Sequence, residues 1–283
     1  MKVSSSVFAI IILIIFIPTS GYLYYLFRAK ATDSALKVIE KVDSKFGPVW
    51  VYEQGDKRCI SFIEPPTPIE QSCSYINNPK ILLHNYAKVL LSTVFIIDNP
   101  QRILVIGLGG ASVQNALNII LPRTKIDSVE INPVIKSLAA KYFNYKENAL
   151  NHIFVEDAAE FAKKSAEGVY DIILLDVFSA DYIPPHLLTD EFMQNVKKML
   201  KKNGVVAINT FAGSKFSELE SRLFKDNFTD YYNLTAGSSR IMIASKNYLP
   251  NLAEISGQSL LWRFNFVEIG INQNQILNLF ISP

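Results

Sequence analysis

The chain has 283 residues, of which 49% are hydrophobic and 19% charged, and this composition excludes a disordered or fibrous protein. Lys plus Arg number 28 and Asp plus Glu number 26, so the net charge of +2 gives no reason to expect a nucleic-acid partner. Two cysteines are too few for a disulfide scaffold or a four-ligand zinc site, and the three histidines lack metal-ligand spacing. We therefore expect a folded protein without a metal site.

An uncharged apolar segment lies near the start of the chain, at residues 7–27, and is long enough to cross a bilayer as a helix. Basic residues flank both of its ends, so charge does not define its orientation. We predict a single-pass membrane anchor within residues 1–30 and a folded part in the cytoplasm. One alternative is a cleaved signal peptide, with small residues at 19–21, that exports the protein. The other is a buried core helix.

Residues 31–98 are predicted to form a small domain with a β-hairpin and connecting helices. The apolar spacing over residues 31–45 predicts a short connector helix. Strand-like runs at residues 48–53 and 58–63 flank a polar turn and predict the hairpin. The apolar run at residues 81–97, followed by Asn-Pro, predicts a second helix.

Cys59 and Cys73 belong to this small domain and lie 14 residues apart in the sequence. As free thiols they would be packing residues in the core, and only an oxidising compartment would join them.

From residue 99 to residue 250, apolar strands alternate with helices, and this alternation predicts an α/β domain with a mainly parallel sheet covered on both faces. The predicted strands cover residues 103–107, 125–130, 153–155, 170–176, 205–209 and 239–245, and the predicted helices cover residues 113–121, 133–143, 158–166, 190–201 and 214–224. Residues 251–283 form a C-terminal extension to which we assign no chemistry.

Four predicted strand ends carry residues suited to a nucleoside pocket, because open α/β sheets bind ligands beyond the carboxyl ends of their strands. The first strand runs into a turn containing Gly107, Gly109 and Gly110, where small residues allow close backbone approach and a helix begins. Glu130 ends the second strand, where an acid is placed to accept hydrogen bonds from two ribose hydroxyls.

The other two strand ends are also acidic. Asp157 is placed either to accept a hydrogen bond from an adenine amino group or to cap the following helix. Asp176 ends an apolar strand, where a carboxylate requires a partner or a functional role. His186, in the loop after Asp176, is a candidate to border the pocket. The set favours an adenosyl sulfonium ligand over a nicotinamide cofactor, which would not need Asp157 and Asp176.

Five motifs carry a resemblance to a known family. They are VIGLGG at residues 105–110, VEINPVI at 129–135, EDA at 156–158, YDIILLD at 170–176 and IPPHLLT at 183–189. With these motifs, residues 43–245 resemble the spermidine/spermine synthase family, the polyamine aminopropyltransferases. The resemblance implies a Rossmann-like class I adenosylmethionine-type methyltransferase fold after a small N-terminal β domain, and a homodimer. It also implies decarboxylated S-adenosylmethionine as donor substrate, an amine such as putrescine as acceptor, and no permanently bound cofactor.

The resemblance also implies roles for individual residues. Glu130 matches the family's acid on the ribose, and Asp157 with Ala158 matches its adenine contact. Asp176 matches the catalytic acid that handles the attacking amine.

Two further matches lie outside these motifs. Gln71 resembles a gate glutamine near the nucleoside, and Tyr86 resembles a tyrosine of the amine pocket.

The chain departs from the family pattern where a polyamine would bind. Gly110 stands where the family turn has Asp, Lys88 replaces the acid of a Tyr-His-Glu motif, and Ser179 replaces a second Asp. Asp181 follows two residues later. Because a polyamine carries several positive charges at neutral pH, nucleoside binding is better supported than polyamine binding. The pattern resembles a divergent spermidine synthase-like branch. An S-adenosylmethionine methyltransferase and a non-catalytic nucleoside-binding relative stay as alternatives.

Overall fold

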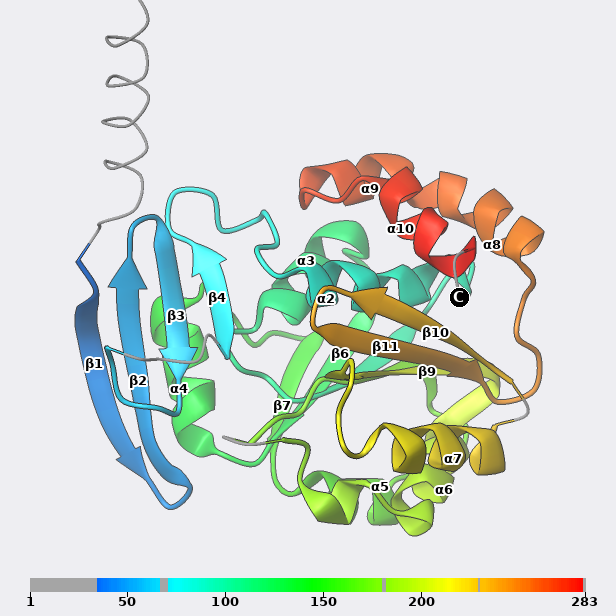
Figure 1. Ribbon diagram of the computed structural model, residues 1–283, viewed down its shortest axis with the longest axis horizontal. Coiled ribbons are helices and arrows are strands. Elements are labelled where there is room, and N and C mark those ends of the chain that lie inside the picture. Colours follow the sequence, from blue (N-terminus) through cyan, green and yellow to red (C-terminus); the bar gives the residue numbers. More distant parts are fainter. Residues whose placement is uncertain (1–34, 67–70, 180–181, 229, 282–283) are drawn as a thin grey trace, which may run out of the picture.

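A computed structural model describes residues 35–66, 71–179, 182–228 and 230–281 (Figure 1). The apolar segment at residues 7–27 and Asp181 lie outside these ranges, so the predicted anchor is not part of the described structure. Across the described ranges, every helix is too short or too polar to span a membrane.

The N-terminal domain is a four-stranded antiparallel sheet in the order β1-β2-β3-β4. Its strands are β1 (Lys37–Ser44), β2 (Gly47–Gln54), β3 (Lys57–Ser61) and β4 (Ser72–Tyr75). The hairpin predicted from sequence is confirmed as β2 and β3, which pair antiparallel across the polar turn.

The connector helix predicted over residues 31–45 is wrong, because this segment contains the edge strand β1. A register shift between Val38 and Glu40 interrupts the two-residue alternation of the strand. Ile39 and Val42, three residues apart, therefore both pack on the same hydrophobic cluster as Val49 of β2. This spacing imitates that of a helix, although β-branched side chains favour a strand.

Cys59 of β3 and Cys73 of β4 lie directly opposite each other and form a disulfide bond. Both are buried against Tyr52. Cys59 and Cys73 are therefore joined, which we expected from the sequence only for a protein in an oxidising compartment.

The second domain contains a seven-stranded sheet in the order β10-β11-β9-β8-β5-β6-β7. Its strands are β5 (Arg102–Ile106), β6 (Lys125–Glu130), β7 (Asn151–Val155), β8 (Tyr170–Leu175), β9 (Leu200–Phe211), β10 (Tyr231–Ala236) and β11 (Ser239–Ser245). The five strands β5 to β9 are parallel, as predicted, and β11 and β10 extend the sheet antiparallel. The sequence did not predict β10, in which only Leu234 is fully buried.

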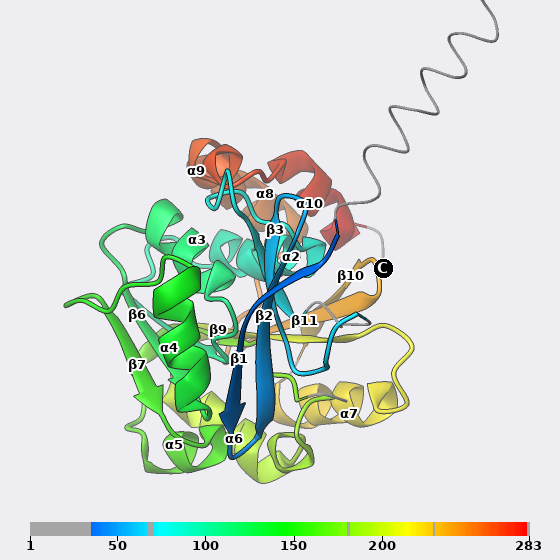
Figure 2. The same cartoon turned by 90° about the vertical axis from the view of Figure 1, so that its left-hand side faces the viewer.

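Helices cover both faces of this sheet, as Figures 1 and 2 show. They are α2 (Asn85–Leu90), α3 (Ser112–Ile120), α4 (Pro133–Tyr142), α5 (Ala158–Lys164), α6 (Asp190–Met199) and α7 (Ser217–Asn227), with short 3-10 turns η1 (Leu91–Phe95) and η2 (Pro185–Leu187). Alternate side chains of β5 point to opposite faces. Ile103 and Val105 pack with α2 and α3, whereas Leu104 and Ile106 pack with α5, α6 and α7.

The C-terminal extension is helical and packs on the α2 and α3 side of the sheet (Figures 1 and 2). It consists of α8 (Leu252–Ser259), η3 (Leu260–Trp262), α9 (Arg263–Glu268) and α10 (Gln273–Ile281). Phe266 and Ile269 are fully buried in the core that these helices share with the sheet. The extension is therefore part of the folded domain.

Candidate active site

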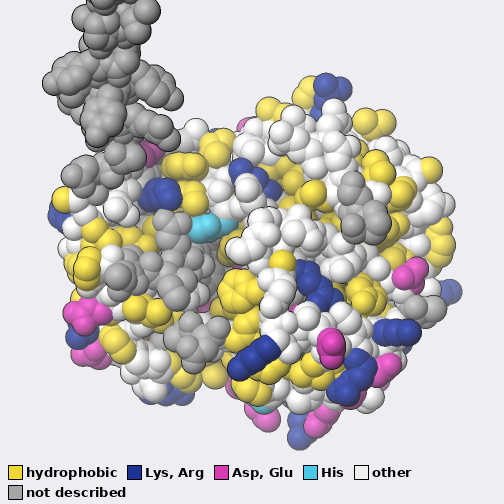
Figure 3. Space-filling view, viewed as in Figure 1, with side chains coloured by type: hydrophobic (Ala, Val, Ile, Leu, Met, Phe, Trp, Pro, Cys, Tyr) yellow, Lys and Arg dark blue, Asp and Glu magenta, His cyan; other side chains and the backbone are white. Residues whose placement is uncertain are grey.

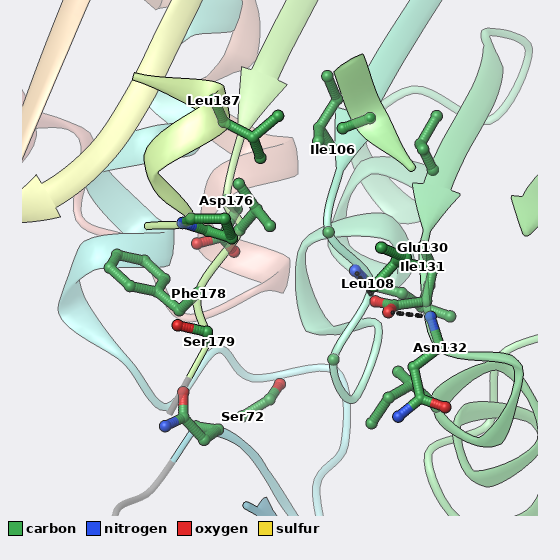
Figure 4. Close-up of a pocket in the computed structure, with 18 of the residues that line it drawn as sticks. Ser72, Ile106, Leu108, Glu130, Ile131, Asn132, Asp176, Phe178, Ser179 and Leu187 are labelled. Carbon is green, nitrogen blue, oxygen red and sulfur yellow. Dashed lines mark hydrogen bonds between the residues drawn. The ribbon is translucent and has the colours of Figure 1, made fainter. Parts of the chain in front are cut away.

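A cavity of about 430 Å³ lies where the carboxyl ends of the parallel strands meet the N-terminal sheet (Figure 4). The turn after β5, the end of β6, the start of α5 and the loop after β8 form one side of it. The N-terminal sheet covers it with Ile60 of β3, Ser72 of β4, and Phe62 and Gln71 between those strands. The cavity is thus enclosed by both domains.

The structure brings most of the sequence-predicted site residues together around this cavity. Those that line it are Gln71, Tyr86, Gly107, Gly109, Glu130, Asp157, Ala158, Asp176 and Ser179. Gly110 is the exception among the described residues. It packs behind the turn, where an added Cβ would lie 2.9 Å from the ring of Phe143 and 3.1 Å from Ser72 Oγ.

Gly107 brings the ends of β5 and β8 close together. Its φ is +101°, and a Cβ on it would lie 2.1 Å from the backbone oxygen of Asp176. Its own carbonyl accepts a hydrogen bond from Gln114 Nε2 at 2.9 Å. Because only glycine combines this φ with such close approach, Gly107 fixes the position of Asp176 relative to the turn.

Glu130 ends β6 and is held by backbone groups on both sides of the cavity floor. The Leu108 N–H donates to Oε2 at 3.2 Å and the Asn132 N–H donates to Oε1 at 2.9 Å (Figure 4). Burial raises the pKa of Glu130, although these backbone hydrogen bonds oppose the shift. The backbone N–H groups of Ile131 and Gly109 also face this carboxylate and lower its pKa.

Asp157 caps helix α5, which confirms the capping interpretation, and it also lines the cavity. Its Oδ1 accepts from the backbone N–H groups of Ala159 at 2.8 Å and Glu160 at 3.2 Å. Its Oδ2 lies 2.9 Å from His186 Nε2. Burial alone would raise the pKa of Asp157, but these hydrogen bonds outweigh it and the pKa is lowered.

His186 reaches Asp157 from η2, and it also lines the cavity. The candidate role at the pocket border is therefore consistent with its position. η2, which follows Asp176 in the sequence, thus contacts the N-terminal end of α5.

Asp176 occupies a desolvated position at the end of β8, where it contacts two other elements. Asn209 Nδ2, from β9, donates to Oδ1 at 2.9 Å, and the phenol of Tyr86, from α2, donates to the same carboxylate. Burial raises the pKa of Asp176 to about 6, and the two hydrogen bonds partly offset this effect. The sequence suggested an ordinary value near 4, because it could not show how deeply the carboxylate is desolvated.

Asn209 is a contact that sequence reasoning missed. The signal was present, since Asn209 is the polar last residue of a predicted strand that lies next to the strand ending in Asp176. Its side chain is buried, at 3% exposure. Polar residues that end neighbouring parallel strands meet at one edge of a sheet.

Ser179, which follows Asp176 in the sequence, lines the cavity and bonds Tyr182. Its N–H and Oγ both donate to the backbone oxygen of Tyr182, at 2.9 and 2.7 Å. The ring of Tyr182 packs against Phe211 and Phe216, and its hydroxyl bonds the buried carboxylate of Glu220. Ser179 and Tyr182 are thus attached to α7 beside the Asp176 end of the cavity.

The charged side chains of the described cavity lining are mainly acidic. They are Glu130, Glu156, Asp157, Asp176 and the titratable His186. Lys88, which would repel a polyamine, is outside this lining. An acidic cavity with apolar walls attracts a cation that also carries a flat ring system.

Comparison with known proteins places the chain among relatives with similar sequence and fold. The Spermine/spermidine synthase domain matches residues 84–234, which is more than half of the chain. The polyamine aminopropyltransferase of Vibrio vulnificus is 33% identical over 228 residues, covering 78% of this chain and 76% of that protein.

Solved structures share the fold at lower identity. A spermidine synthase in complex with the transition state analogue AdoDATO has a TM-score of 0.67 at 18% identity, covering 87% of this chain and 86% of its own. Human methyltransferase-like protein 13 in complex with SAH has a TM-score of 0.58 at 20% identity, covering 71% and 94%. These similarities establish the Rossmann-like methyltransferase-type fold. By its domain match and its sequence identity to the Vibrio protein, the chain belongs to the spermidine/spermine synthase family.

Proposed function

We propose that this protein is an aminopropyltransferase. It transfers the aminopropyl group of decarboxylated S-adenosylmethionine to an amine such as putrescine and releases methylthioadenosine. The observation that carries the proposal is the convergence of Glu130, Asp157 and Asp176, from three separate strand ends, on one acidic cavity. A sulfonium donor and an amine acceptor are both cationic in solution, and the negative potential of the acidic cavity attracts both.

The Glu130 side of the cavity holds the nucleoside. Glu130 accepts hydrogen bonds from the ribose hydroxyls, while Asp157 and Ala158 contact the adenine. The backbone turn at Gly107 and Gly109 lies beneath the sugar and the thioether. These roles agree with the family resemblance and with the positions of the residues in the cavity lining.

Asp176 orients the acceptor amine. A neutral primary amine attacks the carbon next to the sulfonium, the new C–N bond forms as the C–S bond breaks, and the electron pair leaves on sulfur. The ammonium formed then loses a proton to Asp176 or to water. Even with its raised pKa, Asp176 is a weaker base than an amine. Positioning and electrostatic stabilisation therefore contribute more than proton abstraction.

Tyr86 and Ser179 contribute to the amine end of the cavity, with Asp181 as a further acid in the same loop. Gln71 is the gate residue between the two ends. Tyr86 acts through Asp176, to which it donates a hydrogen bond. Its pKa is raised well above the ordinary value by burial and by the charge of Asp176, so the phenol stays protonated as a donor.

A transfer assay with two donors tests the proposal. The purified protein is incubated with putrescine and either S-adenosylmethionine or its decarboxylated form, and the products are identified by mass spectrometry. We expect methylthioadenosine and an aminopropylated amine only with the decarboxylated donor, and Asp176→Asn should abolish this transfer. Methyl transfer from S-adenosylmethionine would identify a methyltransferase instead. Nucleoside binding without transfer to putrescine or other amines would identify a non-catalytic relative.

For location, we propose that residues 7–27 anchor the protein and that the folded part faces the cytoplasm, where the donor is made. The Cys59–Cys73 disulfide favours the alternative of export, because such bonds persist in oxidising compartments. Cell fractionation, N-terminal sequencing and protease protection distinguish the two. An uncleaved, membrane-bound and internally protected chain supports the anchor, whereas a cleaved soluble chain refutes it. The expected homodimer is tested by sedimentation velocity.

A further inference from the structure

The C-terminal helices carry an apolar face that points away from the core. We call Leu260, Leu261, Phe264 and Val267 the C-terminal apolar face. These side chains are 64%, 62%, 83% and 64% exposed, respectively. Single exposed apolar residues are common on proteins, but these four follow each other at helical spacing along η3 and α9.

The opposite side of the same helical segment is already occupied by the protein core. Phe266 and Ile269 are fully buried, and Phe266 packs against Phe95 with ring centroids 4.8 Å apart. The helix is therefore apolar on two sides, and only one of them is used in folding. A second apolar side of this kind is typical of a surface that contacts another apolar phase or partner.

The C-terminal apolar face lies at the end of the molecule where the chain enters the fold. In Figures 1 and 2, α8, α9 and α10 lie at the end of the molecule where β1 begins, and α5 and α6 lie at the opposite end. In Figure 3, several hydrophobic side chains and a basic one lie along the upper edge, over these C-terminal helices, among polar side chains and backbone. The described chain enters the fold at Ala35, at this same end.

Residues 28–34 limit the distance between a bilayer that holds residues 7–27 and the end of the molecule where β1 begins. Residues 28–34 separate the uncharged segment 7–27 from Ala35. A chain spans at most about 3.5 Å per residue, so these seven residues reach no further than roughly 25 Å. A bilayer that holds residues 7–27 therefore lies close to the end of the molecule that carries the C-terminal apolar face.

We propose that the C-terminal apolar face inserts into the bilayer interface as a second membrane contact of this protein. Leu260, Leu261, Phe264 and Val267 enter the region below the lipid headgroups. The exposed Arg263 stays at headgroup level, where a long basic side chain can reach the lipid headgroups. The two contacts together hold the folded part in one orientation, with α5 and α6 away from the membrane. This proposal rests on the anchor assigned to residues 7–27 and is independent of the transfer reaction.

A tryptophan placed on the face reports its contact with lipid. Full-length Phe264→Trp is reconstituted into vesicles of equal parts phosphatidylcholine and phosphatidylglycerol, with plain or brominated acyl chains. Full-length Lys163→Trp is the matched control, because Lys163 is exposed on α5 at the opposite end. The native Trp50 and Trp262 are common to all samples, and their emission in the wild-type protein is subtracted. We expect bromine to quench the emission added at position 264 and to leave that at position 163 unchanged.

Three results would overturn the proposal. In the first, brominated lipid leaves the position 264 emission unchanged although the protein floats with the vesicles. In the second, the chain does not float with vesicles, which removes the anchor. In the third, Phe264→Ser converts a dimer into a monomer in detergent, which assigns the face to a second copy of the chain. Aminopropyl transfer is measured separately in detergent, so its failure is distinguishable from all three.

Discussion

The carboxylate of Asp157 caps a helix and also lines the cavity. Its Oδ1 caps α5, while its Oδ2 faces His186 at the cavity border. From sequence alone the two interpretations were equally acceptable, because a helix cap and an adenine contact both require an acid immediately before the helix. A substitution that preserves the cap and removes the charge separates them.

We predict that Asp157→Ser keeps most of the helix cap, whereas Asp157→Ala loses about 1 kcal/mol of unfolding free energy. Both variants should bind methylthioadenosine about tenfold more weakly, because each removes a charged hydrogen-bond acceptor. Chemical denaturation and calorimetric titration measure the two effects. Wild-type affinity in the Ser variant would show that Asp157 is only a cap.

In the proposed reaction, ionised Asp176 is a stronger hydrogen-bond acceptor for the amine than its protonated form, and burial raises its pKa to about 6. We therefore predict that kcat/KM for the amine, which already declines below about pH 10 as the amine is protonated, falls more steeply below about pH 6. The Asn209 amide lowers this pKa, so Asn209→Ala should move the fall to higher pH. A pH–rate profile measures both, and a change of slope near pH 4 instead of pH 6 in the wild-type protein would contradict the buried environment of Asp176.

The raised pKa of Asp176 also lowers the free energy of unfolding at neutral pH. The unfolded chain releases the Asp176 proton near pH 4 and the folded chain near pH 6. Stability from this group is therefore present below pH 4 and is lost as the pH rises to 6. Asp176→Asn should be more stable above pH 6 by up to about 3 kcal/mol, with the advantage shrinking toward pH 4. Denaturation at pH 7.5 and pH 4.5 measures it, and an equal difference at both values would refute the linkage.

At the scale of elements, the junction between β5 and β8 depends on Gly107. A methyl group there meets the backbone of Asp176, which cannot move without shifting the strand. Gly168 offers a matched control, because it also has a positive φ, +66°, but has open space around its Cβ position.

We predict that Gly168→Ala costs about 1 kcal/mol from backbone strain alone, whereas Gly107→Ala costs several times more or prevents folding. Urea denaturation of both variants measures the difference. Equal losses of stability would show that the close approach of the two strand ends is not constrained by Gly107.

Elements whose apolar residues follow one clear spacing were predictable from the sequence, whereas elements with an irregular spacing of apolar residues were not. The continuous apolar run of β8 has the pattern of a strand buried on both faces, and this pattern also placed Asp176 at the end of the strand. The bulged edge strand β1 imitates a helix, since its bulge places Ile39 and Val42 against one cluster. Strand β10 was missed because Leu234 is its only fully buried residue and its other side chains are half-buried or exposed.

At the scale of the whole molecule, the sequence predicted the alternation of strands and helices from β5 to α7 but not how the N-terminal sheet covers the cavity. Glu130 and Asp176 could be placed at strand ends, because parallel strands bring their carboxyl ends to one edge. The hydrogen bonds to Asp176 from Tyr86 and Asn209 depend on long-range packing of α2 and β9. Such contacts leave no local periodicity in the sequence. The same holds for Gly110, whose role behind the turn depends on Phe143 of a distant segment.

The central claim is that acids from separate strand ends form one nucleoside site. Calorimetric titration of methylthioadenosine into the wild-type protein and the Glu130→Gln variant tests it most directly. Gln keeps the volume of Glu130 but replaces one acceptor oxygen by a donor. We predict one bound nucleoside per chain, with an affinity at least about tenfold weaker in the variant. Failure of the wild-type protein to bind methylthioadenosine, or equal affinity in a folded Glu130→Gln variant, would contradict the account.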